Sequence, residues 1–165
     1  MVAKITQKMI DFSEGNLHNI NHFMKVYGYA KTIGQLENLD EKTQLTLEVA
    51  ALVHDIAIPL CREKYGTARG DLQEKEGLVM AHDFLQGTGL APEIIERVAF
   101  LVGHHHTTEG VDGIDWQILL EADYLVNADE GNQDKEKIEA RMANMYKTKS
   151  GTALLKSMYS KILEG

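Results

Sequence analysis

The distribution of apolar and polar positions along the chain predicts a series of amphipathic helices. Apolar side chains recur three and four residues apart, as on one face of an α-helix, and glycine, proline or short polar stretches separate the segments. The Met and Leu stripes of the last segments either close the core or cover a partner subunit in a homodimer. The pattern predicts helices over residues 3–13, 16–38, 41–58, 71–86, 92–106 and 116–128, and two more within 134–163 that separate near Ser150 and Gly151.

Short-range signals predict where several helices begin and end. Asp40, Asp71 and Asp115 each precede an apolar segment, where a carboxylate accepts hydrogen bonds from the first free N–H groups of a helix. Pro59 is expected to end the third helix, because proline lacks an N–H and clashes with the preceding turn. Residues 60–70 are polar and contain two glycines, so we expect a loop there.

The composition indicates one all-α domain. The chain has 165 residues, of which 44% are hydrophobic and 25% charged, and only two are prolines. A chain of this length buries about 70% of the surface that it exposes when unfolded, so it needs neither a disulfide nor a metal in order to fold. We expect residues 1–165 to form a single domain, a compact bundle of about six to eight helices.

Charge and cysteine content exclude several classes of protein. A net charge of −8 is unlike the basic face of a general nucleic-acid-binding protein. The single Cys61 excludes an internal disulfide and a thiolate zinc cage, which fits a reducing compartment. The N-terminal residues lack the apolar core of a signal peptide, and no apolar run approaches the roughly 20 residues of a membrane span. We therefore expect a cytoplasmic protein, with no membrane partner, that acts on small molecules.

Polar residues inside apolar segments are the main candidates for chemistry. His54 and Asp55 follow the apolar run LTLEVAALV, where burying either group without a partner costs several kcal/mol. Alone, such a pair is equally typical of a structural histidine held by a neighbouring acid. However, His22 lies upstream, three histidines occupy 104–106, and Asp123 lies within another apolar segment. Because helical bundles build metal sites from inward-facing side chains of separate helices, this set predicts a divalent metal site with nitrogen and oxygen ligands.

The order of these residues resembles the HD-domain superfamily of metal-dependent phosphohydrolases. Its signature is an early His, then His-Asp, then a distant Asp, matched here by His22, by His54 and Asp55 in ALVHDIAIP, and by Asp123 in LLEADYLVNADEG. The match covers roughly residues 17–130, with the C-terminal helices packed on this region. The resemblance implies that these four residues bind the primary metal ion. The metal itself stays open among Mn, Fe, Co, Ni and Zn, because imidazole and carboxylate accept them all.

Two-metal members of that family carry further histidines, some of them at the end of the helix that precedes the last Asp. The run at 104–106 stands at this place in the chain. If Val102 faces inward, His105 lies about one turn beyond it and is the first candidate for a second metal or the substrate. His104 is the next candidate, and His106 the last.

The other additional histidine of two-metal members is missing. Four residues before the glycine of the helix predicted over 71–86, this chain has Gln73 where those members have histidine. Glu76 or Glu74 would then supply an oxygen ligand to a second ion, or the site holds one ion and His105 binds the substrate. The resemblance thus implies one or two divalent ions.

The activity implied by the resemblance is hydrolysis of a phosphate ester. The metal ion would lower the pKa of a water molecule and polarise the phosphoryl oxygen, and Asp55 would help to orient or deprotonate that water. The substrate would be a nucleotide or another small phosphorylated metabolite, and the enzyme a phosphomonoesterase or phosphodiesterase. Arg62, Lys64 and Arg69 are candidates for binding the phosphate, unless this stretch is only a solvated loop.

Two other functions stay open at this point. The superfamily fold also houses mixed-valent di-iron oxygenases, and a site of histidines and carboxylates suits iron, although Gln73 argues against a full two-iron ligand set. The third alternative is a non-catalytic module that binds a nucleotide or a regulatory phosphate. Against it, every primary ligand of an active site is present.

Overall fold

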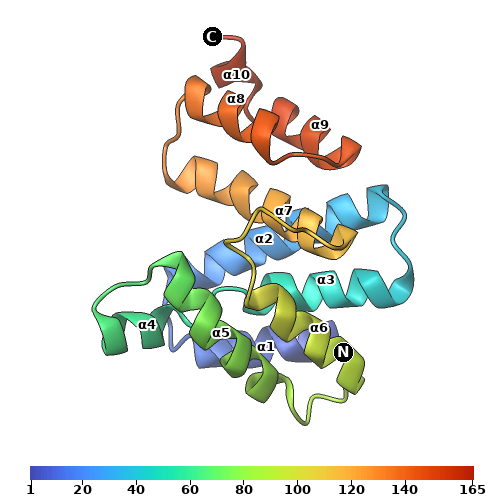
Figure 1. Ribbon diagram of the computed structural model, residues 1–165, viewed down its shortest axis with the longest axis vertical. Helices are drawn as coiled ribbons and strands as arrows, with labels where there is room; N and C mark the ends of the chain where they lie inside the picture. Colours follow the sequence, from blue (N-terminus) through green and yellow to red (C-terminus); the bar gives the residue numbers. More distant parts are fainter.

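The computed structural model describes residues 1–165 and consists of helices without any strand (Figure 1). The predicted all-α class is confirmed, and two helices, α4 and the one-turn α10, come in addition to those predicted. The ten helices are α1 (Val2–Phe12), α2 (Leu17–Leu36), α3 (Glu41–Val53), α4 (Ile58–Tyr65), α5 (Gly70–Leu85), α6 (Pro92–Val102), α7 (Ile114–Glu130), α8 (Lys135–Asn144), α9 (Lys149–Met158) and α10 (Ser160–Leu163).

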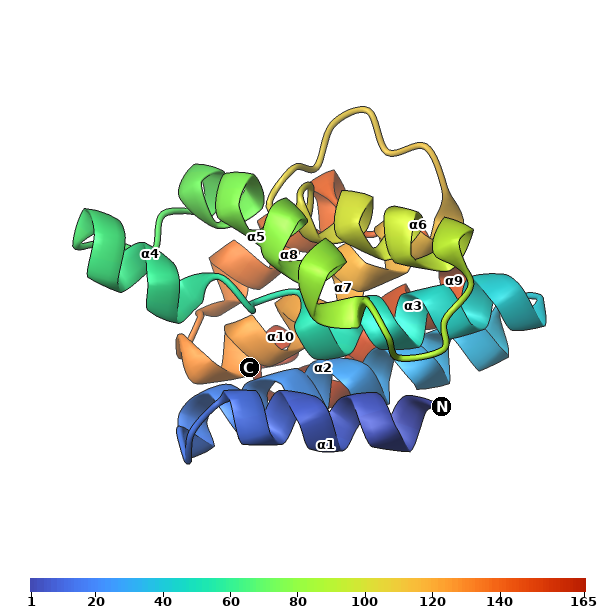
Figure 2. The ribbon, with the colours of Figure 1, turned by 90° about the horizontal axis from the view of Figure 1, so that it is seen from below.

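Helices α2, α3 and α7 form the centre of the fold. α2 packs against α3 and α7, while α5 and α6 form a pair whose second helix packs on α3. α1 packs against α3 on the side opposite the loop between α6 and α7 (Figure 2). The C-terminal helices α8, α9 and α10 form a layer at one end of the molecule, next to α7 (Figure 1). A single cluster of buried apolar side chains runs from Ile5 in α1 to Tyr159 after α9.

Helix α3 is the most deeply buried helix of the first half of the chain. Every residue from Thr46 to Val53 is buried, so this helix has no solvent-facing side in its second half. By length and composition, Glu41–Tyr65 passes as a membrane span, contrary to the sequence-based expectation. A buried core helix has the same composition, and 67% of this apolar window is buried inside the fold. The chain also turns at 54–57, which puts the pair His54 and Asp55 at the centre of the protein.

The prediction of a loop over residues 60–70 is wrong, because α4 occupies most of it. Pro59 is the second residue of α4 and does not end α3, which stops earlier at Val53. Proline suits the first turn of a helix, where its missing N–H has no partner in any case. α4 ends at Gly66, whose φ of 71° is in the left-handed region that favours glycine.

Two of the three predicted aspartate caps are also wrong. Asp40 caps α3 by accepting a hydrogen bond from the N–H of Thr43 at 2.9 Å. In contrast, Asp71 and Asp115 are the second residues of α5 and α7, two positions after the actual N-cap residues Arg69 and Gly113. Their carboxylates pair instead with arginines that the linear pattern does not connect to them, Asp71 with Arg69 and Asp115 with Arg97.

The break between the C-terminal helices lies earlier than predicted. α8 ends at Asn144 and α9 begins at Lys149, so Ser150 and Gly151 lie inside α9. Thr148 determines this start, because its hydroxyl accepts a hydrogen bond from the N–H of Gly151 at 2.9 Å. Glycine at position 151 therefore sits in a first helical turn and does not separate two helices.

A close approach between α5 and α6 positions the histidines that follow α6. A Cβ on Gly77 would lie 2.8 Å from Cγ1 of Val102, so only glycine allows the two helices to come this near. The end of α6 is thereby held against the middle of α5, with the turn at 103–106 next to the start of α5.

Candidate metal centre

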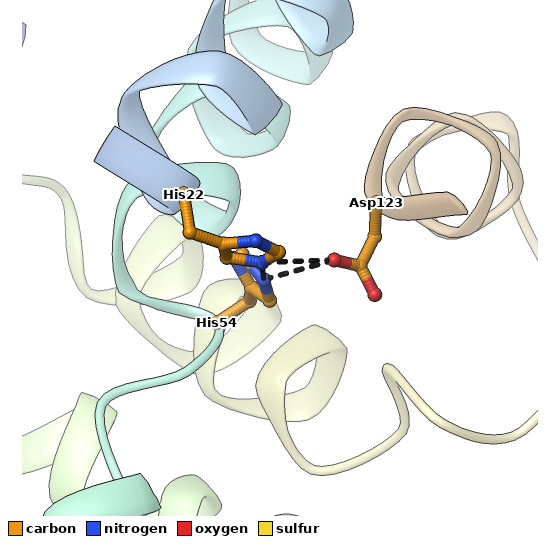
Figure 3. Close-up of side chains that lie close together, drawn as sticks. All are labelled: His22, His54 and Asp123. Atoms are coloured by element: carbon orange, nitrogen blue, oxygen red, sulfur yellow. Dashed lines mark hydrogen bonds and ion pairs between the residues drawn. The ribbon is translucent and has the colours of Figure 1, made fainter. Parts of the chain in front are cut away.

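Four side chains that are distant in the sequence meet between α2, α3 and α7. His22 comes from α2, His54 is the C-cap residue of α3, Asp55 follows it, and Asp123 comes from α7. His22 and His54 point toward the carboxylate of Asp123 (Figure 3). His54 is 1% exposed and both His22 and Asp123 are below 9%, so the cluster lies almost entirely inside the protein.

The ligand atoms of these residues converge on one point. The Nε2 atom of His22 lies 3.1 Å from Oδ2 of Asp55 and 3.2 Å from Oδ1 of Asp123. The Nε2 atom of His54 lies 3.3 Å from each of the same two oxygens. The two Nε2 atoms are themselves 3.3 Å apart. The structure therefore brings together all four residues that the sequence predicts for the primary ion.

The other nitrogen of each ring determines which atom faces the cluster. Nδ1 of His54 donates to the carbonyl of Ala51 at 2.7 Å, and Nδ1 of His22 donates to the carboxylate of Glu130 at 3.0 Å. Since these oxygens only accept, Nδ1 carries the hydrogen and the Nε2 lone pair of each neutral ring faces the cluster.

Glu130 is a contact of the cluster that the sequence analysis missed. It lies seven residues after Asp123 on the same helix, which places both carboxylates on one face of α7 two turns apart. That spacing is the signal that would have found it. A carboxylate behind a metal-binding histidine orients the ring and increases its basicity, so Glu130 supports His22 from outside the ligand set.

The cluster fits a divalent cation. Two nitrogen lone pairs and two carboxylates that face one another at about van der Waals distance or less repel, unless protons or a cation lie among them. Oδ1 of Asp123 and Nε2 of His105 are buried and have no hydrogen-bond partner, although buried polar atoms nearly always have one. Imidazole nitrogens with carboxylate oxygens are the ligands of borderline to hard divalent ions.

His105 extends the cluster toward a second group of ligand atoms. Its Nδ1 donates to the carbonyl of Val102 at 2.7 Å, and its Nε2 lies 3.3 Å from Oδ1 of Asp55. Asp55 thus directs one oxygen to His22 and His54 and the other to His105. Asp55, His105 and His106 offer ligand atoms that all lie within 4.8 Å of one another.

The structure reverses the expected order of His104 and His106. His104 turns away from the cluster, where its Nδ1 donates to the carbonyl of Phe100 at 2.7 Å and its ring stacks on that of Phe100 with centroids 4.0 Å apart. Nε2 of His106 lies 3.1 Å from Oε1 of Gln73. The reason is that α6 ends at Val102, so the three histidines occupy a turn and do not follow helical spacing.

The three residues of α5 that were considered for a second metal ion, Gln73, Glu74 and Glu76, lie in different surroundings. Gln73 is buried beside His106 and donates to the carbonyl of Ala68 at 2.6 Å. Glu74 accepts hydrogen bonds from the backbone N–H of His106 at 3.0 Å, so it holds the histidine turn in place. Glu76 lies outside the cluster, since its carboxylate pairs with Nζ of Lys64 at 2.8 Å.

The predicted phosphate-binding cations do not reach the cluster. Lys64 is paired with Glu76 at 2.8 Å and Arg69 with Asp71 at 2.8 Å, while Arg62 is exposed on α4. None of the three lines the cavity beside the cluster.

A different cation, Arg141 of α8, does line that cavity. The cavity has a volume of about 150 Å³ and is bordered by the cluster residues His105, His106 and Asp123, and by side chains of α7 and α8. Sequence analysis missed Arg141 because it lies beyond the family signature on a mostly polar helix, and no local pattern marks it.

The histidines and carboxylates of the cluster shift one another's pKa values. Burial lowers the pKa of His22, but contacts with Asp123 and Asp55 outweigh this effect and raise it to about 9. The pKa of His54 is likewise raised well above its usual value, against the effect of burial, by the charge of Asp55 and contact with Asp123. Burial alone would raise the pKa values of both aspartates, but the histidines hold them well below their usual range. Without metal, protons therefore neutralise the cluster at neutral pH.

Metal binding is consequently expected to release protons and to weaken as the pH falls. Metal ligation needs neutral histidine, whereas His22 without metal is protonated below about pH 9. The apparent affinity for Mn²⁺ should rise with pH from 6 to 8, by up to about tenfold per pH unit for each proton displaced. Isothermal titration calorimetry in buffers of different ionisation enthalpy measures the protons released. An affinity independent of pH together with a buffer-independent enthalpy would contradict this expectation.

The fold and the cluster define an all-α protein with a histidine and aspartate site suited to a divalent ion. The family model described as HD domain matches residues 19–142, which is most of the chain. This chain therefore belongs to the HD-domain family, as the order of its His, His-Asp and Asp residues predicted.

Comparison with individual proteins adds evidence on the fold. No curated protein matches the sequence. A crystal structure of a predicted HD superfamily hydrolase from an uncultured Thermotogales bacterium superposes on this chain with a TM-score of 0.71 and 20% sequence identity. The match covers 98% of this chain and 87% of that chain. It shows that the two proteins share one arrangement of helices over nearly all of this chain.

Proposed function

We propose that this protein is a metal-dependent phosphohydrolase that cleaves a phosphate ester of a nucleotide or another small metabolite. Membership of the HD-domain family and the histidine and aspartate cluster support a metal-dependent hydrolase in general. The observation that carries the proposal is the convergence of His22, His54 and Asp123, whose ligand atoms all lie within 4.8 Å of one another and include the buried Oδ1 of Asp123, which has no hydrogen-bond partner.

The residues of the cluster have distinct roles in this proposal. His22, His54, Asp55 and Asp123 would hold the ion, which supplies Lewis acidity and activates water for attack on phosphorus. Asp55 is the one ligand that reaches both groups of the site, through its two oxygens, and it is also the most exposed of the four at 21% of its side chain. This position suits it to orient the attacking water and to accept its proton.

We assign one tightly bound ion and a weaker second position. The primary group contains three buried ligands, whereas the second group of Asp55, His105 and His106 is more exposed and shares Asp55 with the first. Its remaining side is occupied by the Gln73 amide, which is already engaged by His106 and by the backbone of Ala68.

Two substitutions of Gln73, to histidine and to asparagine, test whether a second ion binds beside His106. Gln73→His introduces an imidazole beside His106 and is expected to increase the affinity for a second Mn²⁺ ion about tenfold or more, as a further ligand would. Gln73→Asn is the control, since it keeps an amide but adds no nitrogen ligand. The number of ions per chain, measured by elemental analysis after dialysis at several Mn²⁺ concentrations, checks the prediction. If Gln73→His binds the second ion no better than the Asn variant does, the assignment of a second position is wrong.

A substrate panel tests the proposed function itself. The protein, loaded in turn with Mn²⁺, Co²⁺ or Ni²⁺, is incubated with nucleoside monophosphates, cyclic nucleotides and small phosphate esters, and the release of phosphate or monoester is followed. Metal-dependent turnover that EDTA abolishes supports the hydrolase. Absence of turnover with every metal and substrate class would favour the non-catalytic module, and two irons per chain with a paramagnetic signal in the protein as purified would favour the oxygenase.

A further inference from the structure

Two cavities border Arg141 of α8. Arg141 lines the cavity that contains His105, His106 and Asp123, and it also lines a second cavity of about 420 Å³. The second cavity is bordered by Lys137 and by the amides Gln133 and Asn144, with one alanine as its only apolar residue. Arg141 therefore lies between the cavity beside the metal centre and the one that Lys137 borders.

Arg141 and Lys137 face these cavities without an acidic partner. Neither residue belongs to any ion pair of the protein, although its 25 acidic residues outnumber its 17 basic ones. The guanidinium of Arg141 lies over the ring of Tyr124, 5.4 Å from its centroid, and its one hydrogen-bond partner is the sulfur of Met145 at 4.0 Å. Both contacts position the group and leave its strong donors free.

The spacing of the two cations matches a substrate with two anionic groups. Residues 137 and 141 are four apart, so their side chains lie one helical turn apart on the same face of α8. Arg141 is the nearer of the two to the cluster, because it alone borders both cavities. A guanidinium at this place can bind the oxygens of a phosphoryl group that are not engaged at the metal centre.

We infer that α8 carries an anion-binding subsite in which Arg141 binds the phosphoryl group at the metal centre and Lys137 binds a second anionic group of the same molecule. The inference rests on the proposed function and narrows it to small, polar organic phosphates that bear a second phosphate or a carboxylate. Four of the five residues that line the second cavity carry an amide or a cation, which favours a polar and anionic group there over a lipid chain.

Two matched ligands that cannot be hydrolysed test this subsite without relying on turnover. Propylphosphonate carries one anionic group, and 3-phosphonopropionate carries the same phosphonate and a carboxylate at the other end. Their binding to the Mn²⁺-loaded protein is measured by calorimetry. The wild type is expected to bind 3-phosphonopropionate more tightly than propylphosphonate. Arg141→Gln should lower the affinity for both ligands by about 10- to 100-fold, the equivalent of one charge-assisted hydrogen bond.

Variants of α8 distinguish the specific contributions of Arg141 and Lys137 from a general effect of removing positive charge from this helix. Lys137→Gln should lower the affinity for 3-phosphonopropionate alone, by about threefold to tenfold, because only this ligand has a carboxylate that can reach residue 137. Arg141→Lys retains the charge and should recover part of the lost affinity. Lys135→Gln removes the same charge from the same helix, about 200° around its axis from Lys137, and should change neither ligand. The Mn²⁺ stoichiometry should be unchanged in all four variants, since none is a metal ligand.

The outcomes distinguish the subsite from the proposed function. If Arg141→Gln binds both phosphonates as the wild type does, or the wild type binds neither, the subsite is overturned even where the substrate panel shows hydrolysis. If Lys137→Gln affects both ligands equally or neither, the second anionic group is overturned. If the phosphonates follow the expected pattern but no phosphate ester is hydrolysed, the subsite stands and the hydrolase does not.

Discussion

His54→Ala is expected to abolish binding of the primary metal ion and to lower kcat/KM for any phosphate-ester substrate by about a thousandfold or more. His54 lies at the centre of the cluster, with its Nε2 within 3.3 Å of the ligand atoms of His22, Asp55 and Asp123. Alanine removes a nitrogen ligand and leaves two carboxylates facing each other with one histidine between them. The measurements are Mn²⁺ content, Mn²⁺ affinity by calorimetry and turnover of the best substrate from the panel.

A matched histidine elsewhere on the fold provides the control. His18 lies one turn before His22 on α2 but is exposed, so His18→Ala should retain the metal content and activity of the wild type. His54→Gln fills more of the buried space than alanine does. If this variant folds and still loses metal and turnover, the loss of activity is not caused by unfolding. A folded His54→Ala protein that keeps its metal and its turnover would overturn the assignment of the metal centre.

Glu121→Ala is expected to lower the free energy of unfolding by about 3 to 5 kcal/mol, the largest stability effect that we predict. Glu121 is completely buried in α7, and its carboxylate contacts no residue of the metal cluster. Its Oε1 accepts hydrogen bonds from the backbone N–H groups of Lys147 at 2.7 Å and Thr148 at 2.9 Å, and from the amide of Gln117 at 2.9 Å. Alanine would leave the buried N–H of Thr148 and the N–H of Lys147 without this acceptor, while the Gln117 amide would keep only the carbonyl of Met145.

The same carboxylate joins the C-terminal layer to the rest of the fold. Its Oε2 accepts a hydrogen bond from the hydroxyl of Thr148, the residue that caps α9. Loss of this anchor should loosen the segment that connects α8 to α9, and the position of Arg141 with it. Glu139→Ala, on the exposed side of α8, is the control and should change stability by less than about 0.5 kcal/mol. Urea unfolding followed by circular dichroism measures both; a Glu121→Ala protein within 1 kcal/mol of the wild type would contradict this role.

The positions of most helices could be predicted from the sequence, because one-sided burial leaves a local periodic pattern. The ends of helices were less predictable, since several partners compete for the same terminal groups. Pro59 is compatible with the end of one helix and with the start of the next, and only the turn at 54–57 places it in α4. Asp115 looks like a helix cap, but Arg97 from α6 binds its carboxylate at 2.7 Å, and α7 begins at Ile114, two residues before the predicted start.

The sequence by itself determined the all-α class and, through the order of its His, His-Asp and Asp residues, the family. The polar residues His22, His54, Asp55 and Asp123 stood out in their apolar segments without coordinates, and the family resemblance joined them into one predicted ligand set. The tertiary structure alone decided which side chains share a cavity. It turned His104 away and His106 inward, placed Glu130 behind His22, and brought Arg141 from α8 to the cavity. These contacts depend on where helices end and on how they pack across the core, which are properties of residues distant in the chain and leave no local pattern in it.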